Sequence, residues 1–166
     1  MITLVRARCV EFGGGLARPV RNARATWPRR EGLLLELTGS RDEVGEGEAS
    51  PLPGLSRESL EDCRAALTRL PFAALRIDEA ASFAAWSAAI SRVGAGLPAA
   101  ARFALESAAL DLLGRALGLP AWALVVPDAQ IAPTPRTLGA LLSGTAPAPV
   151  AAEAVAARER GIRCLK

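Results

Sequence analysis

Residues 45–59 read Gly-Glu-Gly-Glu-Ala-Ser-Pro-Leu-Pro-Gly-Leu-Ser-Arg-Glu-Ser, and this stretch decides how the rest of the chain is arranged. A strand over residues 43–49 is expected to end here, because the Pro-Leu-Pro-Gly run favours a turn. The glycines of that strand indicate close approach of another backbone. Ser56 is then a candidate helix N-cap, with Glu58 in the first turn complementing the helix dipole. The stretch therefore joins a strand-rich opening to a helical middle.

Three strands are predicted up to this turn, and they form an antiparallel meander. Residues 1–12 are rich in β-branched side chains and alternate as a strand does, and residues 33–37 are a short apolar run. The strand at 43–49 completes the set. Residues 18–30 are polar and contain prolines, so we expect an irregular loop there. Long loops of this kind often bind ligands or close over a site, although an ordinary exposed loop is the alternative.

Three helices are predicted after the turn. Residues 60–70 and 78–93 carry apolar side chains at the spacing of one helix face. Residues 99–117 are apolar on nearly all sides, which indicates a helix buried at the centre of the domain. Gly118 follows directly and is suited to end that helix.

The composition changes where prolines become frequent, and a domain boundary is expected there. This predicts a first domain over residues 1–126, a linker over 127–134 and a second domain over 135–166. Strand, helix and strand patterns follow one another within the last segment, as in a βαβ unit. A single such unit cannot bury a parallel strand on both faces, so we expect the start of a truncated (β/α) barrel.

Composition excludes several classes of function. The chain has no histidine, which removes Ser-His-Asp and Cys-His catalysis and histidine-ligated zinc. Its net charge of +3 comes from scattered residues and does not predict nucleic-acid binding. No signal peptide or membrane span is recognised. Its 3 cysteines fit apolar positions and have no metal spacing, so we expect reduced, packed thiols and a cytoplasmic protein.

Two sets of side chains are candidates for chemistry. Lys166 is the one lysine among 20 basic residues, and an amine can be tuned to act as a base near neutral pH whereas a guanidinium cannot. A chance terminal lysine is the alternative. Glu46 and Glu48 share a strand face and resemble a carboxylate pair for acid/base or metal chemistry, but a structural role is favoured. Glu106 and Asp111 are also interpreted as structural partners.

Three segments resemble the enolase superfamily. Residues 45–49 are similar to its Gly-x-Gly-Glu-Ala segment, residues 101–114 to its third capping helix, and residues 161–166 to the approach to a Lys-x-Lys motif. The resemblance implies an α+β fold, in which an N-terminal capping domain of a three-stranded antiparallel meander and a helical bundle precedes the first βαβ unit of a (β/α) barrel. The chain ends on the first lysine of that motif, so only half of it is seen.

Within the muconate-lactonizing-enzyme subgroup, the chain most resembles o-succinylbenzoate synthases. Residues 30–35, 51–54 and 58–60 carry this closer resemblance. N-acylamino-acid racemases, dipeptide epimerases and muconate cycloisomerases of the same superfamily are the alternatives. A non-catalytic capping-domain fragment is the alternative from another class. Whether the protein is a homo-oligomer is left open.

The synthase resemblance implies a lyase that dehydrates a small carboxylate substrate for menaquinone synthesis with Mg²⁺. It places Arg24, Thr26, Trp27 and Leu52 next to the substrate, although Leu52 also suits a hydrophobic plug. It gives Lys166 a supporting role beside a second lysine, whose pKa it would lower. It places the metal ligands on later barrel strands. The chain alone is therefore expected to be inactive and to need the missing barrel segment or a second chain as partner.

Overall fold

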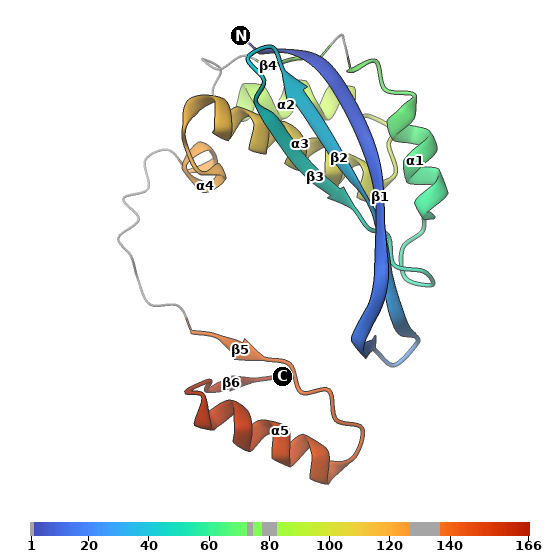
Figure 1. Cartoon of the computed structure of the whole chain (residues 1–166), viewed down its shortest axis with the longest axis vertical. Helices are drawn as coiled ribbons and strands as arrows, with labels where there is room; N and C mark the ends of the chain where they lie inside the picture. The colour runs from blue at the N-terminus through green and yellow to red at the C-terminus, as the bar shows by residue number, and fades with distance from the viewer. Residues whose placement is uncertain (1, 73–74, 78–82, 127–136) are drawn as a thin grey trace. The chain divides into compact units, whose positions relative to one another are not determined.

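The structure is a computed structural model, and it describes residues 2–72, 75–77, 83–126 and 137–166. It divides into two compact units, of which the first holds the described residues up to Val126 and the second those from Thr137 (Figure 1). The linker expected at residues 127–134 lies outside the described residues.

Among the described residues, a four-stranded antiparallel sheet forms one layer of the first unit. Strand β1 (Ile2–Arg21) pairs with β2 (Thr26–Gly39), and β2 pairs with β3 (Val44–Ala49), which confirms the predicted meander. The short strand β4 (Arg76–Ile77) was not predicted and pairs with the beginning of β1. The resulting order is β3-β2-β1-β4, so β3 lies at one edge of the sheet.

The prediction of a loop at residues 18–30 is wrong. These residues form the last part of β1, a tight turn and the beginning of β2. The prolines suggested a loop. Strand pairing is in fact interrupted between Gly15 and Val20, and Pro19 lies within that interruption. Pro28 lies opposite it. Because proline lacks an N–H group, it is tolerated where the ladder is already broken, and the strands continue past it.

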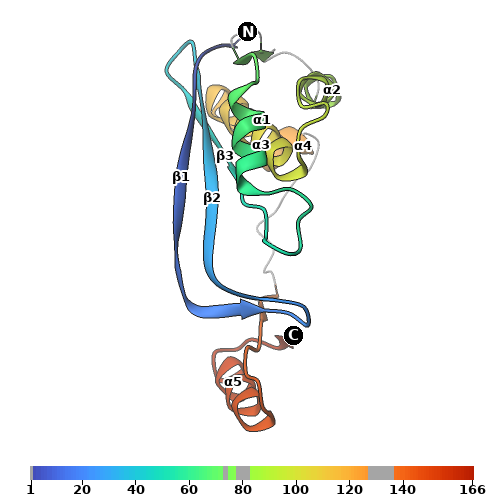
Figure 2. The ribbon, with the colours of Figure 1, turned by 90° about the vertical axis from the view of Figure 1, so that its right-hand side faces the viewer.

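Four helices of the described chain cover one face of this sheet (Figure 2). They are α1 (Leu60–Thr68), α2 (Phe83–Val93), α3 (Ala99–Leu117) and α4 (Ala121–Val125). The bounds of α3 are those predicted, whereas the predicted beginning of α2 lies outside the described residues and α4 was not predicted. No helix in the described part of the chain has the length and apolar character needed to cross a membrane.

Strand β3 lies directly against α3, with no side chain between the two backbones. A Cβ atom on Gly47 would lie 2.0 Å from the carbonyl oxygen of Ala104, and one on Gly45 would lie 2.2 Å from that of Ala108. Both alanines are fully buried. The close approach predicted from the glycines is therefore confirmed, and the approaching backbone is that of α3.

Helix α3 supplies the centre of the core, but only one of its faces is buried. The buried residues are Ala101, Ala104, Leu105, Ala108, Ala109, Leu112, Leu113 and Gly114. Phe103 is 62% exposed, which corrects the expectation that the helix is buried nearly all round. The helix packs on the sheet along one stripe, and Phe103 points away from that stripe. Gly118 ends the helix in the left-handed conformation, as predicted.

The N-cap of helix α1 is Ser59 and not Ser56, which the sequence analysis proposed. The Ser59 hydroxyl accepts a hydrogen bond from the Asp62 amide at 3.1 Å, and the Asp62 carboxylate accepts one from the Ser59 amide at 2.8 Å. This reciprocal pair is a capping box. Glu58 complements a different helix, since its carboxylate accepts a hydrogen bond from the amide of Ala100 in the first turn of α3 at 2.9 Å.

The second unit is a strand, a helix and a strand, as the sequence predicts. Strands β5 (Gly139–Ala140) and β6 (Cys164–Leu165) are parallel and flank α5 (Pro147–Glu159) in the sequence. Each strand has two residues. Gly161 has a φ of 81° just after the helix, in the left-handed conformation that glycine adopts readily at helix ends.

All three cysteines are free, but only two of them pack inside the chain. Cys63 is fully buried and Cys9 is half-buried, and burial raises the pKa of both thiols. Cys164 is exposed, so the expectation of a packed thiol is wrong at that position. Its strand, β6, is paired with β5 in a sheet of two strands, which leaves much of its surface uncovered.

We expect Gly47→Ala to lower the free energy of unfolding by about 3 kcal/mol, because the new methyl group would overlap the Ala104 carbonyl oxygen and force β3 away from α3. Urea unfolding of the 166-residue chain followed by circular dichroism measures this. Gly14→Ala is the matched control, since nothing lies within 4 Å of a Cβ atom at that position. Equal unfolding midpoints for the two variants would contradict the close-contact explanation.

Candidate binding site

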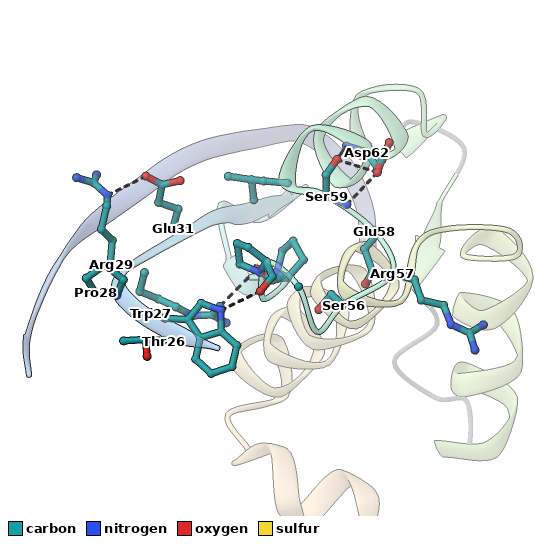
Figure 3. Close-up of a pocket in the computed structure, with 15 residues that line it drawn as sticks. Thr26, Trp27, Pro28, Arg29, Glu31, Ser56, Arg57, Glu58, Ser59 and Asp62 are labelled. Atoms are coloured by element: carbon teal, nitrogen blue, oxygen red, sulfur yellow. Dashed lines mark hydrogen bonds and ion pairs between the residues drawn. The ribbon is translucent and has the colours of Figure 1, made fainter. Parts of the chain in front are cut away.

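A cavity of about 580 Å³ opens between the beginning of β2 and the turn that leads into α1 (Figure 3). Three segments of the first unit form its walls: the beginning of β2, the Pro-Leu-Pro-Gly turn, and the segment that enters α1. The lining residues are Thr26, Trp27, Pro28, Arg29, Arg30, Glu31, Pro51, Pro53, Gly54, Ser56, Arg57, Glu58, Ser59, Leu60 and Asp62. The cavity therefore lies beside the stretch on which the sequence analysis centred.

Two side chains of β2 fasten the turn to the sheet. The indole Nε1 of Trp27 donates a hydrogen bond to the carbonyl oxygen of Pro53 at 2.9 Å, and Trp27 is only 8% exposed. The guanidinium of Arg30 donates to the carbonyl oxygens of Ser50 and Pro51. These bonds connect β2 to the segment that forms the turn.

The turn is also closed by its own hydrogen bonds. The carbonyl oxygen of Leu52 accepts from the amides of Leu55 and Ser56 at 3.0 and 2.8 Å. The Leu52 amide in turn donates to the Ser56 hydroxyl at 2.9 Å. Ser56 therefore closes the turn instead of capping α1, and the main chain of Leu52 is a structural part of the turn.

The acidic side chains of the cavity wall all have partners. Glu31 accepts a hydrogen bond from the Arg29 Nε at 3.1 Å, and Glu58 accepts one from the amide of Ala100. Hydrogen bonds from the backbone and hydroxyl of Ser59 lower the pKa of the Asp62 carboxyl below its ordinary value. A carboxylate that is held in this way is poorly suited to act as a base or a metal ligand. The wall is suited to binding, through the indole surface and the arginines.

No group of three or more metal-binding side chains occurs in the part of the chain that the structure describes. Glu46 and Glu48 lie exposed on the same face of β3, as the alternation predicts. The Glu46 amide donates to the Asp111 carboxylate at 3.0 Å, and the Glu48 carboxylate accepts from the Ser50 hydroxyl. These contacts favour the structural interpretation of the acidic residues, with Asp111 satisfying an amide on the open edge of β3.

The structure brings two of the predicted substrate-binding residues to the cavity. Thr26 and Trp27 line it. Leu52 is half-buried and Arg24 is exposed, and neither is among the lining residues. Arg24 lies in the turn between β1 and β2, where its amide donates to the Asn22 side chain at 2.8 Å.

Lys166 belongs to the second unit, where the parallel sheet fixes its backbone. Its amide donates to the carbonyl oxygen of Ala140 at 3.0 Å, and its carbonyl oxygen accepts from the amide of Leu142 at 2.8 Å. The side chain is exposed. The supporting role that the resemblance gives to Lys166 stays a prediction.

Sequence reasoning missed the residues that tie the walls together. Arg30 had no specific signal, since nothing in the sequence indicates which carbonyl oxygens its guanidinium reaches. The Pro53 carbonyl had none, because every residue carries a carbonyl and only the fold selects the one that meets Trp27. Ser59 had the clearest signal, an acidic residue three positions later in Asp62.

A family model for the MenC N-terminal domain matches residues 19–102, about half of the chain. The match includes β3 and the three segments that form the cavity, namely the beginning of β2, the turn and the segment that enters α1. The chain belongs to the MenC N-terminal domain family. A search of curated proteins found no match.

Solved structures match the chain over nearly its whole length. A mandelate racemase/muconate lactonizing protein from Herpetosiphon aurantiacus is 25% identical, with a TM-score of 0.79 over 98% of this chain and 44% of that one. A dipeptide epimerase from Methylococcus capsulatus is 27% identical, with a TM-score of 0.75 over 98% of this chain and 45% of that one. An o-succinylbenzoate synthase from Thermosynechococcus elongatus is 23% identical, with a TM-score of 0.60 over 97% and 42%.

These similarities confirm the predicted membership of the enolase superfamily and the predicted fold. The antiparallel sheet with its helices is the capping domain of that superfamily, and the short parallel sheet follows it. The chain spans less than half the length of the structures that it matches. The fold of the capping domain is thus established, and the activity of a whole protein is a separate question.

We expect Trp27→Phe to lower the free energy of unfolding by about 1 kcal/mol, because it keeps the aromatic ring but removes the donor to the Pro53 carbonyl. Amide hydrogen exchange at Leu55 and Ser56 should also become faster, since the turn loses its tie to β2. Trp122→Phe is the matched control, because Trp122 is 48% exposed on α4. Unchanged exchange in the turn would show that the indole bond does not hold it.

The Asp62 side chain should stabilise the fold only at pH values at which its carboxyl group is ionised. Its pKa is lowered from 3.8 by Ser59, so its contribution is present above that pH and is lost as the pH falls through the folded-state pKa. The difference in unfolding free energy between the wild type and Asp62→Asn should therefore shrink below pH 3.8. In Ser59→Ala, an NMR titration should find the pKa of Asp62 closer to 3.8 than in the wild type. A difference independent of pH would refute the role given to the capping box.

Proposed function

We propose that this chain is the N-terminal portion of an o-succinylbenzoate synthase-like enzyme, a lyase that dehydrates a succinyl-hydroxycyclohexadiene carboxylate in menaquinone synthesis. The observation that carries the proposal is the match of the MenC N-terminal domain to residues 19–102. The resemblance of residues 30–35 and 51–54 to the synthases supports it, because these segments form two walls of the cavity.

In this proposal the first unit binds and encloses the substrate. Thr26 and Trp27 line the cavity and would contact the substrate there. Arg24 and Leu52 would approach it from the hairpin turn and from the Pro-Leu-Pro-Gly turn. The bonds from Trp27 and Arg30 to the turn would keep these contacts in place during turnover. Preformed walls of this kind reduce the entropy lost on binding.

The acid/base chemistry would use lysine. Lys166 would hold a positive charge beside a second lysine and lower the pKa of that base by like-charge repulsion. The base would then remove the proton next to the substrate carboxylate. Such a step needs a neutral amine near pH 7, which the arginines of this chain cannot supply.

Mg²⁺ is proposed by analogy, because the dipeptide epimerase and the synthase structures are both described as magnesium complexes. The described residues of this chain do not fit a magnesium site, since they contain no group of three or more metal-binding side chains. The metal ligands would therefore have to come from outside them. The proposal further implies a cytoplasmic enzyme with the rest of the barrel as its structural partner.

A dipeptide epimerase is the second candidate, and one observation favours it. The epimerase from Methylococcus capsulatus is more similar to this chain than the synthase is, with 27% against 23% identity and a TM-score of 0.75 against 0.60. Both reactions begin with removal of a proton next to a carboxylate, so the capping unit alone does not separate them. The family match of residues 19–102 leads us to place the synthase first.

A protein that carries this chain followed by a complete barrel should dehydrate the cyclohexadiene substrate, and a chelator should abolish turnover. The assay is run in parallel with N-succinylamino acids and with dipeptides. Turnover of dipeptides alone would reject the synthase in favour of the epimerase. The 166-residue chain by itself should show no turnover of any of them, and magnesium-dependent activity of this polypeptide would refute that expectation.

A further inference from the structure

A single carboxylate holds the turn that follows β5. Glu153 Oε2 accepts hydrogen bonds from the amides of Ser143 at 2.6 Å and Gly144 at 3.2 Å. Its Oε1 accepts one from the Ser143 hydroxyl at 3.0 Å. Two successive amides directed at one oxygen are an arrangement that binds anions, and here α5 supplies the anion from its own side chain.

A close contact with α5 also restricts the conformation of this turn. A Cβ atom on Gly144 would lie 2.7 Å from the amide nitrogen of Val150 in the first turn of α5, so the turn passes close to the helix. Removing the carboxylate would therefore take away three hydrogen bonds that hold the turn and would leave the amides of Ser143 and Gly144 to bond with water.

The same turn is directly continuous with the backbone that fixes Lys166. Leu142, the residue before Ser143, donates its amide to the Lys166 carbonyl oxygen at 2.8 Å. The carboxyl ends of parallel strands meet at one edge of a sheet, and barrel enzymes place their active sites at that edge. The turn is thus separated by one residue from a hydrogen bond that holds the main chain of Lys166.

We propose that Glu153 is a positioning residue, which fixes the main chain at the carboxyl end of β5 and thereby the place of Lys166 beside it. This inference rests on the proposed function, in which Lys166 supports the acid/base lysine. Glu153 itself does not touch the substrate. Its loss should reduce kcat more than it changes KM, because misplacement of an acid/base group affects the transition state more than substrate binding.

The kinetic test uses a protein that carries this chain followed by a complete barrel. Glu153→Ala should lower kcat by about tenfold with KM nearly unchanged, and Glu153→Gln, which keeps one acceptor oxygen, should lower it less. Ser143→Ala should have a smaller effect, since it removes the hydroxyl bond and keeps both amide bonds. Glu159→Gln is the matched control, as Glu159 is exposed on the same helix. Wild-type kcat in both Glu153 variants would overturn the proposal.

A second measurement uses the 166-residue chain and does not depend on activity. In Glu153→Ala, which removes the acceptor oxygens, the amides of Ser143 and Gly144 should exchange with solvent at least about tenfold faster than in the wild type, while amides in the middle of α5 keep their protection. Unchanged protection in the turn would also overturn the proposal. If the longer wild-type protein turned over none of the carboxylate substrates, the proposed function would fail instead, and amide exchange would still decide whether Glu153 holds the turn.

Discussion

The first unit depends on the contact between the backbones of β3 and α3. Gly45 and Gly47 let the strand lie on the helix at a distance that no side chain would permit. Because the chain leaves β3 directly into the Pro-Leu-Pro-Gly turn, this contact also sets where the turn begins. Glu58 closes the arrangement at the other end, where it accepts from the amide of Ala100 in α3. One wall of the cavity is therefore anchored to the central helix at both ends.

The parts of the fold that could be predicted are those in which a residue type at a given position indicates one kind of local structure. Glycines at alternate positions of β3 indicated a close backbone, and Gly118 indicated the end of α3. The prolines near residues 18–30 were misleading, since a missing N–H group ends a regular ladder but costs nothing where pairing is already interrupted. The N-cap of α1 was misplaced because Ser56 was judged without its partner. Only Ser59 has the acidic residue at the spacing that a capping box requires.

The candidate site was less predictable than the fold, for a physical reason. Thr26 and Trp27, which the synthase resemblance placed next to the substrate, line the cavity. What holds the cavity together is mostly main chain, namely the carbonyl oxygens of Ser50, Pro51 and Pro53. A carbonyl has no signature in a sequence. The direction of a carbonyl follows from the conformation of the turn. That conformation depends on pairing between strands that are far apart in the sequence.

The pairing of charges in the cavity wall limits what this unit can contribute to a reaction. Glu58 and Asp62 satisfy amides at helix beginnings, so using either as a base or metal ligand would leave a main-chain donor without its partner. The cavity wall is therefore better suited to contacting a ligand through Thr26 and Trp27 than to acid/base chemistry. In the proposed reaction, the groups that move protons would have to be other residues, of which the amine of Lys166 is the candidate that this chain contains.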